Sequence, residues 1–351
     1  MNPQALTPMA IVISLISSGS IVAWTMAAVR WQRQQSLLEF QSRLPVPWGL
    51  LDLAAVVVLN IFVTGTMLAV GTSILGISRD RASSDILPPA LQSKVILLYS
   101  TGTLLSLWLG VIWVRKRVSA SGADLGIQPN RVLTDIALGI TAFVMLAFPV
   151  FTLQVTINVL TQRENTHPLI ELLRNDPDPR FFLIAGFAAV VAAPLTEEYL
   201  FRVLLQGWIE NAIGARRARR PEGKISGWVM SLVSGQRASN DPGHFPTADR
   251  PRCETGASDL GQVMAATDRV DLEHPQPLPI ALAPAYVPIV VSSLLFAAAH
   301  LGQGTAPIPL FFLALGLGYV YQRTHRVLPC IVVHMLVNLF SLLQLWVIVH
   351  S

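Results

Sequence analysis

The stretch FFLIAGFAAVVAAPLTEEYLFRVLLQGW, from Phe181 to Trp208, organises the rest of this chain. It is long and apolar enough to cross a bilayer, yet its middle carries Glu197, Glu198 and Arg202. Ionisable side chains at that depth are costly, and they mark functional sites that face the interior of a helix bundle. Glu198 and Arg202 are four residues apart and share a helix face, so they can pair. Glu197 projects about 100° away from Glu198, which leaves it less easily claimed by Arg202.

The composition is that of an integral membrane protein. Of the 351 residues, 52% are hydrophobic and only 13% are charged, whereas soluble domains carry about 25% charged residues. The net charge is +4, and the basic residues form short clusters between apolar runs. Such clusters indicate membrane orientation, so we expect a lipid bilayer and no nucleic acid as partner. Cys253 and Cys330 lack the spacing of a disulfide framework or a metal site.

Eight apolar runs predict an all-α fold, a polytopic membrane helix bundle of about eight transmembrane spans. They cover residues 9–29, 49–71, 95–114, 132–160, 181–208, 286–301, 308–321 and 327–349. We expect N-terminal spans in residues 1–120 and a functional core in residues 121–349, interrupted at about 216–279 by a polar cytoplasmic insert. The insert is rich in Gly, Pro, Ser and Asp and lacks sustained periodicity, which indicates an extramembrane segment.

The distribution of basic residues predicts the orientation of the chain. The heaviest Lys and Arg clusters follow the first, third, fifth and seventh runs. The positive-inside rule therefore places these clusters and the insert in the cytoplasm and both termini outside, in the plasma (inner) membrane. Both cysteines would then lie in or near the cytoplasm, where disulfides are disfavoured.

Polar residues in the later spans complete a candidate site. His300 ends the run Phe296-Ala-Ala-Ala-His300, and His334 and Asn338 share a face of the last span. A carboxylate with imidazoles can activate water, either as a general base or through a bound metal. The amide of Asn338 can stabilise an oxyanion. Together these groups suit the hydrolysis of an amide.

Each of these residues also has a structural interpretation. A histidine or an asparagine in a membrane helix often only forms a hydrogen bond between helices. For His300 or His334 taken singly, this interpretation is as good as the functional one, and for Asn338 alone it is better. Glu198 and Arg202 can be a purely structural pair. Glu197 is hardest to explain in this way, because nothing in the sequence pairs with it.

The chain resembles the CPBP intramembrane metalloprotease family, which includes the CAAX prenyl proteases and the bacteriocin-processing, Abi-type proteins. The resemblance rests on three ordered motifs, Glu197-Glu198-x-x-x-Arg202, Phe296-x-x-x-His300 and His334-x-x-x-Asn338. It extends to Leu125-Gly126-Ile127 and to Gly316-x-Gly318-Tyr319-x-Tyr321-x-Arg323-Thr324. It covers residues 125–338 apart from the insert, which is longer than the family usually needs. The first two spans show nothing specific to the family.

The resemblance implies a CAAX-protease-like intramembrane endopeptidase that hydrolyses a peptide bond in a membrane-tethered protein or peptide. By analogy, Glu197 and His300 would activate water, and His334 and Asn338 would hold the oxyanion or complete a metal site. Glu198, Arg202 and Phe296 would support the site. The alternative is a non-proteolytic membrane scaffold or immunity-type protein that keeps the polar core. A transporter that uses buried Glu and His as a proton relay is a more distant alternative.

Two mechanisms remain open from the sequence. Glu197, His300 and His334 supply suitable ligand atoms for zinc or another divalent cation, although the compact His-Glu-x-x-His arrangement is absent. A buried glutamate beside a histidine can instead act as a general base without any ion. The sequence slightly favours a metal, because one cation both compensates a buried carboxylate and polarises water.

Overall fold

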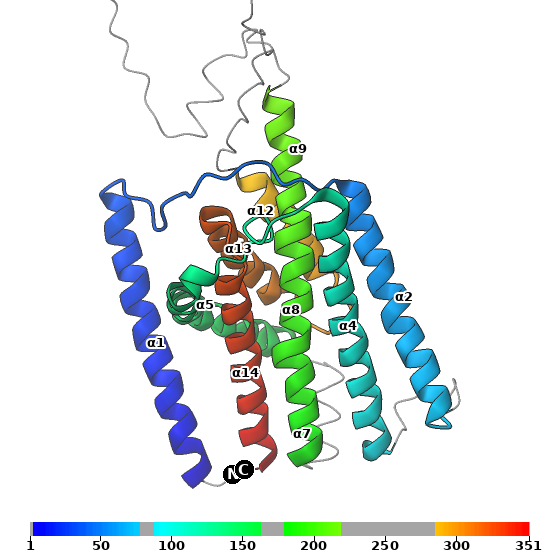
Figure 1. The fold of residues 1–351 in the computed structure, drawn as a ribbon. Coiled ribbons are helices and arrows are strands. Elements are labelled where there is room, and N and C mark those ends of the chain that lie inside the picture. Colours follow the sequence, from blue (N-terminus) through cyan, green and yellow to red (C-terminus); the bar gives the residue numbers. More distant parts are fainter. Residues whose placement is uncertain (1–2, 78–87, 163–178, 219–284, 351) are drawn as a thin grey trace, which may run out of the picture. The chain divides into compact units, whose positions relative to one another are not determined.

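Helices form all of the regular structure in residues 3–77, 88–162, 179–218 and 285–350, which are the residues that this computed structural model describes. The predicted all-α class is therefore confirmed. In chain order the elements are α1 (Pro3–Gln32), α2 (Leu50–Ile74), α4 (Pro89–Val118), η1 (Pro129–Arg131), α5 (Val132–Thr161), α7 (Pro179–Gly186), η2 (Phe187–Ala192), α8 (Ala193–Glu198), η3 (Tyr199–Gln206), α9 (Gly207–Ala218), α12 (Tyr286–Ala298), α13 (Pro307–Thr324) and α14 (Leu328–His350) (Figure 1).

Six of the described helices are long and apolar enough to cross a bilayer, which fits a polytopic membrane bundle. They cover Pro8–Gln32, Leu50–Ile74, Leu91–Val118, Pro129–Thr161, Pro179–Gly214 and Leu328–Val347. This is two fewer than the eight predicted spans. Helix α12 has 13 residues, which reach only about 20 Å across a hydrocarbon core of about 30 Å. Helix α13 has 18 residues, but its last turn contains Gln322 and Arg323.

The chain divides into two units, Met1–Ala215 with Ala281–Ser351, and Arg216–Ile280. The predicted insert at about 216–279 falls on the second unit and, beyond the end of α9, lies outside the described residues. The division between residues 1–120 and 121–349 stays a prediction. Everything below concerns the first unit.

Glycines allow the helices of this unit to approach closely. Helix α2 packs along α4, α12 along α13, and α1 and α14 against α5 (Figure 1). Lipid is as apolar as the side chains, so close packing drives such contacts in a membrane. A Cβ atom on Gly102 of α4 would lie 3.0 Å from Thr64 Cα of α2. One on Gly139 of α5 would lie 2.9 Å from the carbonyl oxygen of Pro329 in α14.

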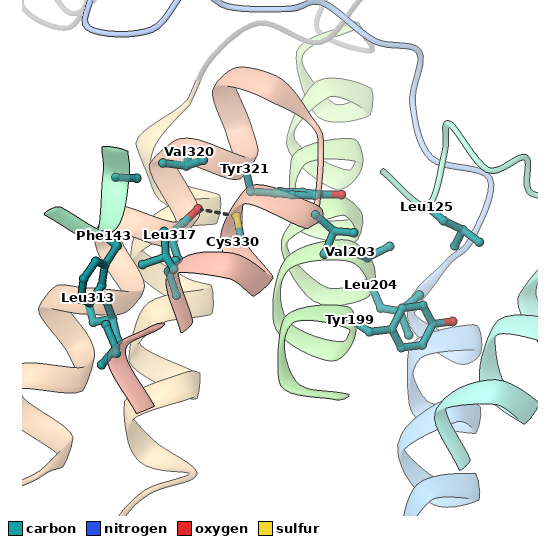
Figure 2. Packing of buried hydrophobic residues seen from close by; sticks show 14 of the residues in the cluster. Leu125, Phe143, Tyr199, Val203, Leu204, Leu313, Leu317, Val320, Tyr321 and Cys330 are labelled. Atoms are coloured by element: carbon teal, nitrogen blue, oxygen red, sulfur yellow. Dashed lines mark hydrogen bonds between the residues drawn. The ribbon is translucent and has the colours of Figure 1, made fainter. Parts of the chain in front are cut away.

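The organising helix runs from α7 to α9. Buried apolar side chains connect it to α5, α13 and α14. Figure 2 shows Leu313 of α13 beside Phe143 of α5, and Tyr321 of α13 pointing toward Val203 of η3. The Cys330 thiol of α14 donates a hydrogen bond of 3.4 Å to the carbonyl of Leu317. These contacts hold α13 and α14 side by side.

The turn before α14 is fixed by two contacts. The Val327 amide donates to the Gly126 carbonyl at 3.1 Å, and Arg326 forms a buried ion pair with Asp135 of α5. Gly126 has a φ of +73°, and a Cβ atom there would lie 2.9 Å from the Val327 nitrogen. Glycine alone meets both conditions without strain. This turn therefore sets the position of α14 along its axis.

Candidate active site

The predicted site residues come from the organising helix, α12 and α14. They are Glu197 and Glu198 at the end of α8, Arg202 in η3, Phe296 in α12, His300 in the turn after α12, and His334 and Asn338 in α14. The two glutamates lie between η2 and η3, which are both π-helical. Such widened turns are rare in proteins and are frequent at functional sites.

Glu197 lies between the two histidines. Its Oε2 atom is 3.9 Å from His300 Nε2 and 3.8 Å from His334 Nε2. Its side chain is 26% exposed, yet the Oε2 atom is buried and has no hydrogen-bond partner among the described residues. A buried carboxylate oxygen without a hydrogen-bond partner is costly. Among the site residues, Oε2 of Glu197 is therefore the atom for which a structural role explains least.

Hydrogen bonds fix which nitrogen of each histidine carries the proton. Nδ1 of His300 lies 2.8 Å from the Phe296 carbonyl, and Nδ1 of His334 lies 2.8 Å from Glu198 Oε1. Both partners can only accept, so both Nδ1 atoms donate. In a neutral ring the Nε2 atom then keeps its lone pair. Both Nε2 lone pairs therefore face Glu197.

Glu198 joins His334 to Arg202. Its Oε2 atom accepts from Arg202 Nε at 3.1 Å, and its Oε1 atom accepts from His334. Glu198 and Arg202 are completely buried, so each charge compensates the other where water cannot reach. Glu198 thereby fixes the tautomer and the orientation of the His334 ring.

Phe296 fills the space among the polar residues. Its ring centroid is 4.9 Å from that of His300 and 5.7 Å from that of His334, and it lies 5.4 Å from Arg202 Cζ. The ring is completely buried. Phe296 therefore keeps both imidazoles and the guanidinium in place by packing.

Asn338 has a different neighbour from the other predicted residues. Its amide donates a hydrogen bond of 2.7 Å to the Ala189 carbonyl in η2. A side-chain amide has two N–H donors, and this hydrogen bond uses one of them. The structure thus brings Glu197, His300 and His334 together and places Asn338 one turn further along α14.

Residues 276–340 match the family described as "Type II CAAX prenyl endopeptidase Rce1-like". Over this stretch the chain is similar to that family. The match confirms the family expected from the motifs, and it agrees with the long apolar helices of an integral membrane protein. A search of curated proteins and a search of solved structures found no match.

The Rce1-like stretch contains only part of the site. Phe296, His300, His334 and Asn338 lie within it, whereas the glutamates and Arg202 precede it. The short distances from Glu197 and Glu198 to the histidines connect these two parts of the chain.

The donor atoms of the site are of the kinds that bind a divalent cation. Metal-binding histidines usually donate their other N–H to a carboxylate or a backbone carbonyl, as both histidines do here. No three His, Cys, Asp or Glu side chains in the described parts of the chain are grouped closely enough to hold a metal ion as they stand. Ligands of a tetrahedral zinc ion are about 3.3 Å apart. The two distances from Glu197, 3.8 and 3.9 Å, exceed this spacing modestly.

Reasoning from the sequence missed a polar row that continues beyond the site. Glu198, Arg202, Gln206 and Glu210 recur at intervals of four along the organising helix, and all four are buried. The interval of four could have predicted this row, because residues four apart share a helix face. The row extends to Arg43, whose partner is Glu210 at 3.0 Å.

Proposed function

We propose that this chain is an intramembrane endopeptidase that hydrolyses a peptide bond in a membrane-associated protein or peptide. The observation that carries the proposal is the free Oε2 atom of Glu197, which faces the Nε2 atoms of His300 and His334. The Rce1-like match supports a CAAX-type peptidase in general. The side chains of Glu197 and His300 are 26% and 16% exposed, which supports access of water to the site.

In the proposed reaction, Glu197 takes a proton from a water molecule while the water oxygen attacks the carbonyl carbon of the peptide bond. The C–N bond then breaks, and Glu197 passes the proton to the departing amine. One water is thus added across the bond. His300 orients the water through Nε2, because its Nδ1–H is held by the Phe296 carbonyl.

The proposal keeps both mechanisms for charge stabilisation. The second N–H of Asn338 donates to the oxyanion as it forms. Without a cation, His334 can stabilise the oxyanion only when it carries a proton on Nε2 as well as on Nδ1. A divalent cation held by Glu197, His300 and His334 would instead polarise the water and stabilise the negative charge.

The test is hydrolysis of a quenched peptide library by the purified protein in liposomes. Glu197→Gln should lower turnover by at least about 100-fold, because it removes the base and keeps the shape of the side chain. Glu39→Gln makes the same change at an exposed position outside the site and serves as the control. Full activity of Glu197→Gln would exclude this mechanism. A wild-type protein that cleaves no peptide would favour the scaffold or immunity-type alternative.

We also propose that the chain lies in the plasma membrane with both termini outside and its basic clusters in the cytoplasm. The alternation of basic clusters supports this orientation. Cys330 is buried, so Cys253, which lies outside the described residues, is the natural reporter. An impermeant maleimide should label Cys253 only after cells are permeabilised, and Cys253→Ser should remove the signal. Labelling of intact cells would reverse the orientation.

A further inference from the structure

A row of buried hydrogen bonds leads away from His334 along the organising helix. Glu198 accepts from His334 on one side and from Arg202 on the other. Arg202 Nη1 donates to Ser292 Oγ of α12 at 3.3 Å, and Ser292 Oγ lies 3.3 Å from the amide oxygen of Gln206. The organising helix and α12 are therefore joined by polar contacts directly behind the site.

The segment 33–49, between α1 and α2, holds the far end of this row. Gln206 donates through Nε2 to Glu210 at 3.2 Å and to the Gly318 carbonyl at 2.9 Å. Glu210 accepts from Arg43 of that segment at 3.0 Å. These two contacts fix the amide of Gln206, because turning it over would place its oxygen against a carboxylate and a carbonyl.

We propose that Ser292 and Gln206 are positioning residues for His334, acting through Arg202 and Glu198. The proposal rests on the peptidase function proposed above. Beyond Glu198, Ser292 is the hydrogen-bond partner that orients the Arg202 guanidinium, because Nη2 has no partner among the described residues. A guanidinium has a rigid fork of donors, so its orientation selects one orientation of the Glu198 carboxylate.

The direction of each bond supports this assignment. Arginine only donates, so the Ser292 oxygen must accept from Arg202. The Ser292 proton goes either to Gln206 or to the Ile289 carbonyl at 3.1 Å, and the oxygen remains an acceptor in both cases. Ser292 therefore holds Arg202 in both cases, and the Glu198 carboxylate then fixes the Nδ1–H tautomer of His334. When the Ser292 proton goes to Gln206, Gln206 holds Ser292 in turn.

Ser293 provides a matched control in the next position of α12. Both serines are completely buried, but Ser293 Oγ has no hydrogen-bond partner in the described part of the chain. Ser292→Ala should lower kcat about tenfold with KM unchanged, which is the usual cost of losing a partner behind a catalytic group. Ser293→Ala should match the wild type. Alanine favours helix, so both variants should fold, and their melting temperatures show whether they do.

A second substitution tests the next link. Gln206→Met keeps the length of the side chain and removes its amide, so kcat should again fall with KM unchanged. Because both residues act through Arg202, the double variant with Ser292→Ala should lose little more than either single one. If the losses in kcat of the two single variants multiply in the double variant, the two residues act independently and the inference is wrong. Equal kcat values for Ser292→Ala and Ser293→Ala would also overturn it.

Nitrogen NMR of histidine-labelled protein gives a readout that does not need activity. His334 should be protonated on Nδ1 in the wild type and in Ser293→Ala, and it should be a mixture of tautomers in Ser292→Ala. An unchanged tautomer in Ser292→Ala would overturn the inference. If the wild type cleaves no peptide but the tautomer changes as expected in Ser292→Ala, the proposed function fails and the positioning row stands.

Discussion

Two buried clusters on the organising helix contain the same kinds of side chain, a glutamate that contacts an arginine and a histidine. They are Glu198, Arg202 and His334 in the first cluster, and Glu210, Arg43 and His325 in the second. In the second cluster, His325 Nδ1 donates to the Gln41 carbonyl at 2.7 Å, and Nε2 lies 3.4 Å from Glu210. His325 Nε2 has no hydrogen-bond partner among the described residues, so in both clusters the Nε2 atom faces a carboxylate oxygen without a hydrogen bond.

The first cluster differs by one additional carboxylate. Glu197 presents an oxygen without a partner to His334 Nε2, and its side chain is 26% exposed, against 5% for Glu210. In the second cluster both Glu210 oxygens accept hydrogen bonds, and the cluster ties the segment 33–49 to α9 and to the end of α13. A buried Glu-Arg-His arrangement is therefore structural by itself. The proposed chemistry depends on the additional carboxylate of Glu197, whose side chain is partly exposed.

The largest expected difference between the clusters is in metal binding. On the metal-assisted mechanism, a strong chelator should abolish peptide hydrolysis, and zinc or another divalent ion should restore it. His334→Ala should remove the bound metal, because it removes one of three ligands. His325→Ala should leave the metal content unchanged, because the second cluster offers one imidazole and a carboxylate whose two oxygens already accept hydrogen bonds from Arg43 and Gln206. Elemental analysis of the purified variants measures this directly.

The opposite result has an equally clear meaning. Purified, active protein that contains no stoichiometric metal and is indifferent to chelators would leave Glu197 as a general base that acts alone. The distances of 3.8 and 3.9 Å from Glu197 to the two histidines would then be the working distances of the site.

The sequence predicted the helices well because each apolar run is a local signal. The four-residue spacing likewise predicted the pair of Glu198 and Arg202, which the structure shows at 3.1 Å. Among the described residues six of the eight predicted runs form helices long enough to span a bilayer, and α12, which is apolar throughout, has only 13 residues. Length, and not hydropathy, decides that case.

Contacts between distant segments were not predictable from local patterns. The backbone N–H of Gln41 donates to the Arg323 carbonyl, and the indole N–H of Trp48 donates to the Leu204 carbonyl at 3.2 Å. Nothing near Gln41 or Trp48 in the sequence specifies either partner. The π-helical form of η2 also depends on a distant segment, because Asn338 of α14 donates a hydrogen bond to its Ala189 carbonyl. The ordered motifs indicated which residues belong to the site, but only the fold shows that Asn338 has this second role.

The smallest expected difference between the clusters lies in stability. Glu198→Gln leaves Arg202 buried without its counter-charge, which should cost about 3 kcal/mol of unfolding free energy. Glu210→Gln should cost less, about 1–2 kcal/mol, because the Arg43 side chain is 12% exposed and keeps its bond of 3.0 Å to the Tyr321 hydroxyl. The eight tryptophans allow thermal unfolding to be followed by fluorescence in the same preparations.

Activity should distinguish Glu198→Gln from Glu210→Gln further. Glu198→Gln should lower kcat, because it weakens the acceptor for His334, whereas Glu210→Gln should leave kcat within roughly twofold. Equal losses of activity in the two variants would mean that both clusters serve the chemistry, and the distinction drawn from Glu197 would be wrong.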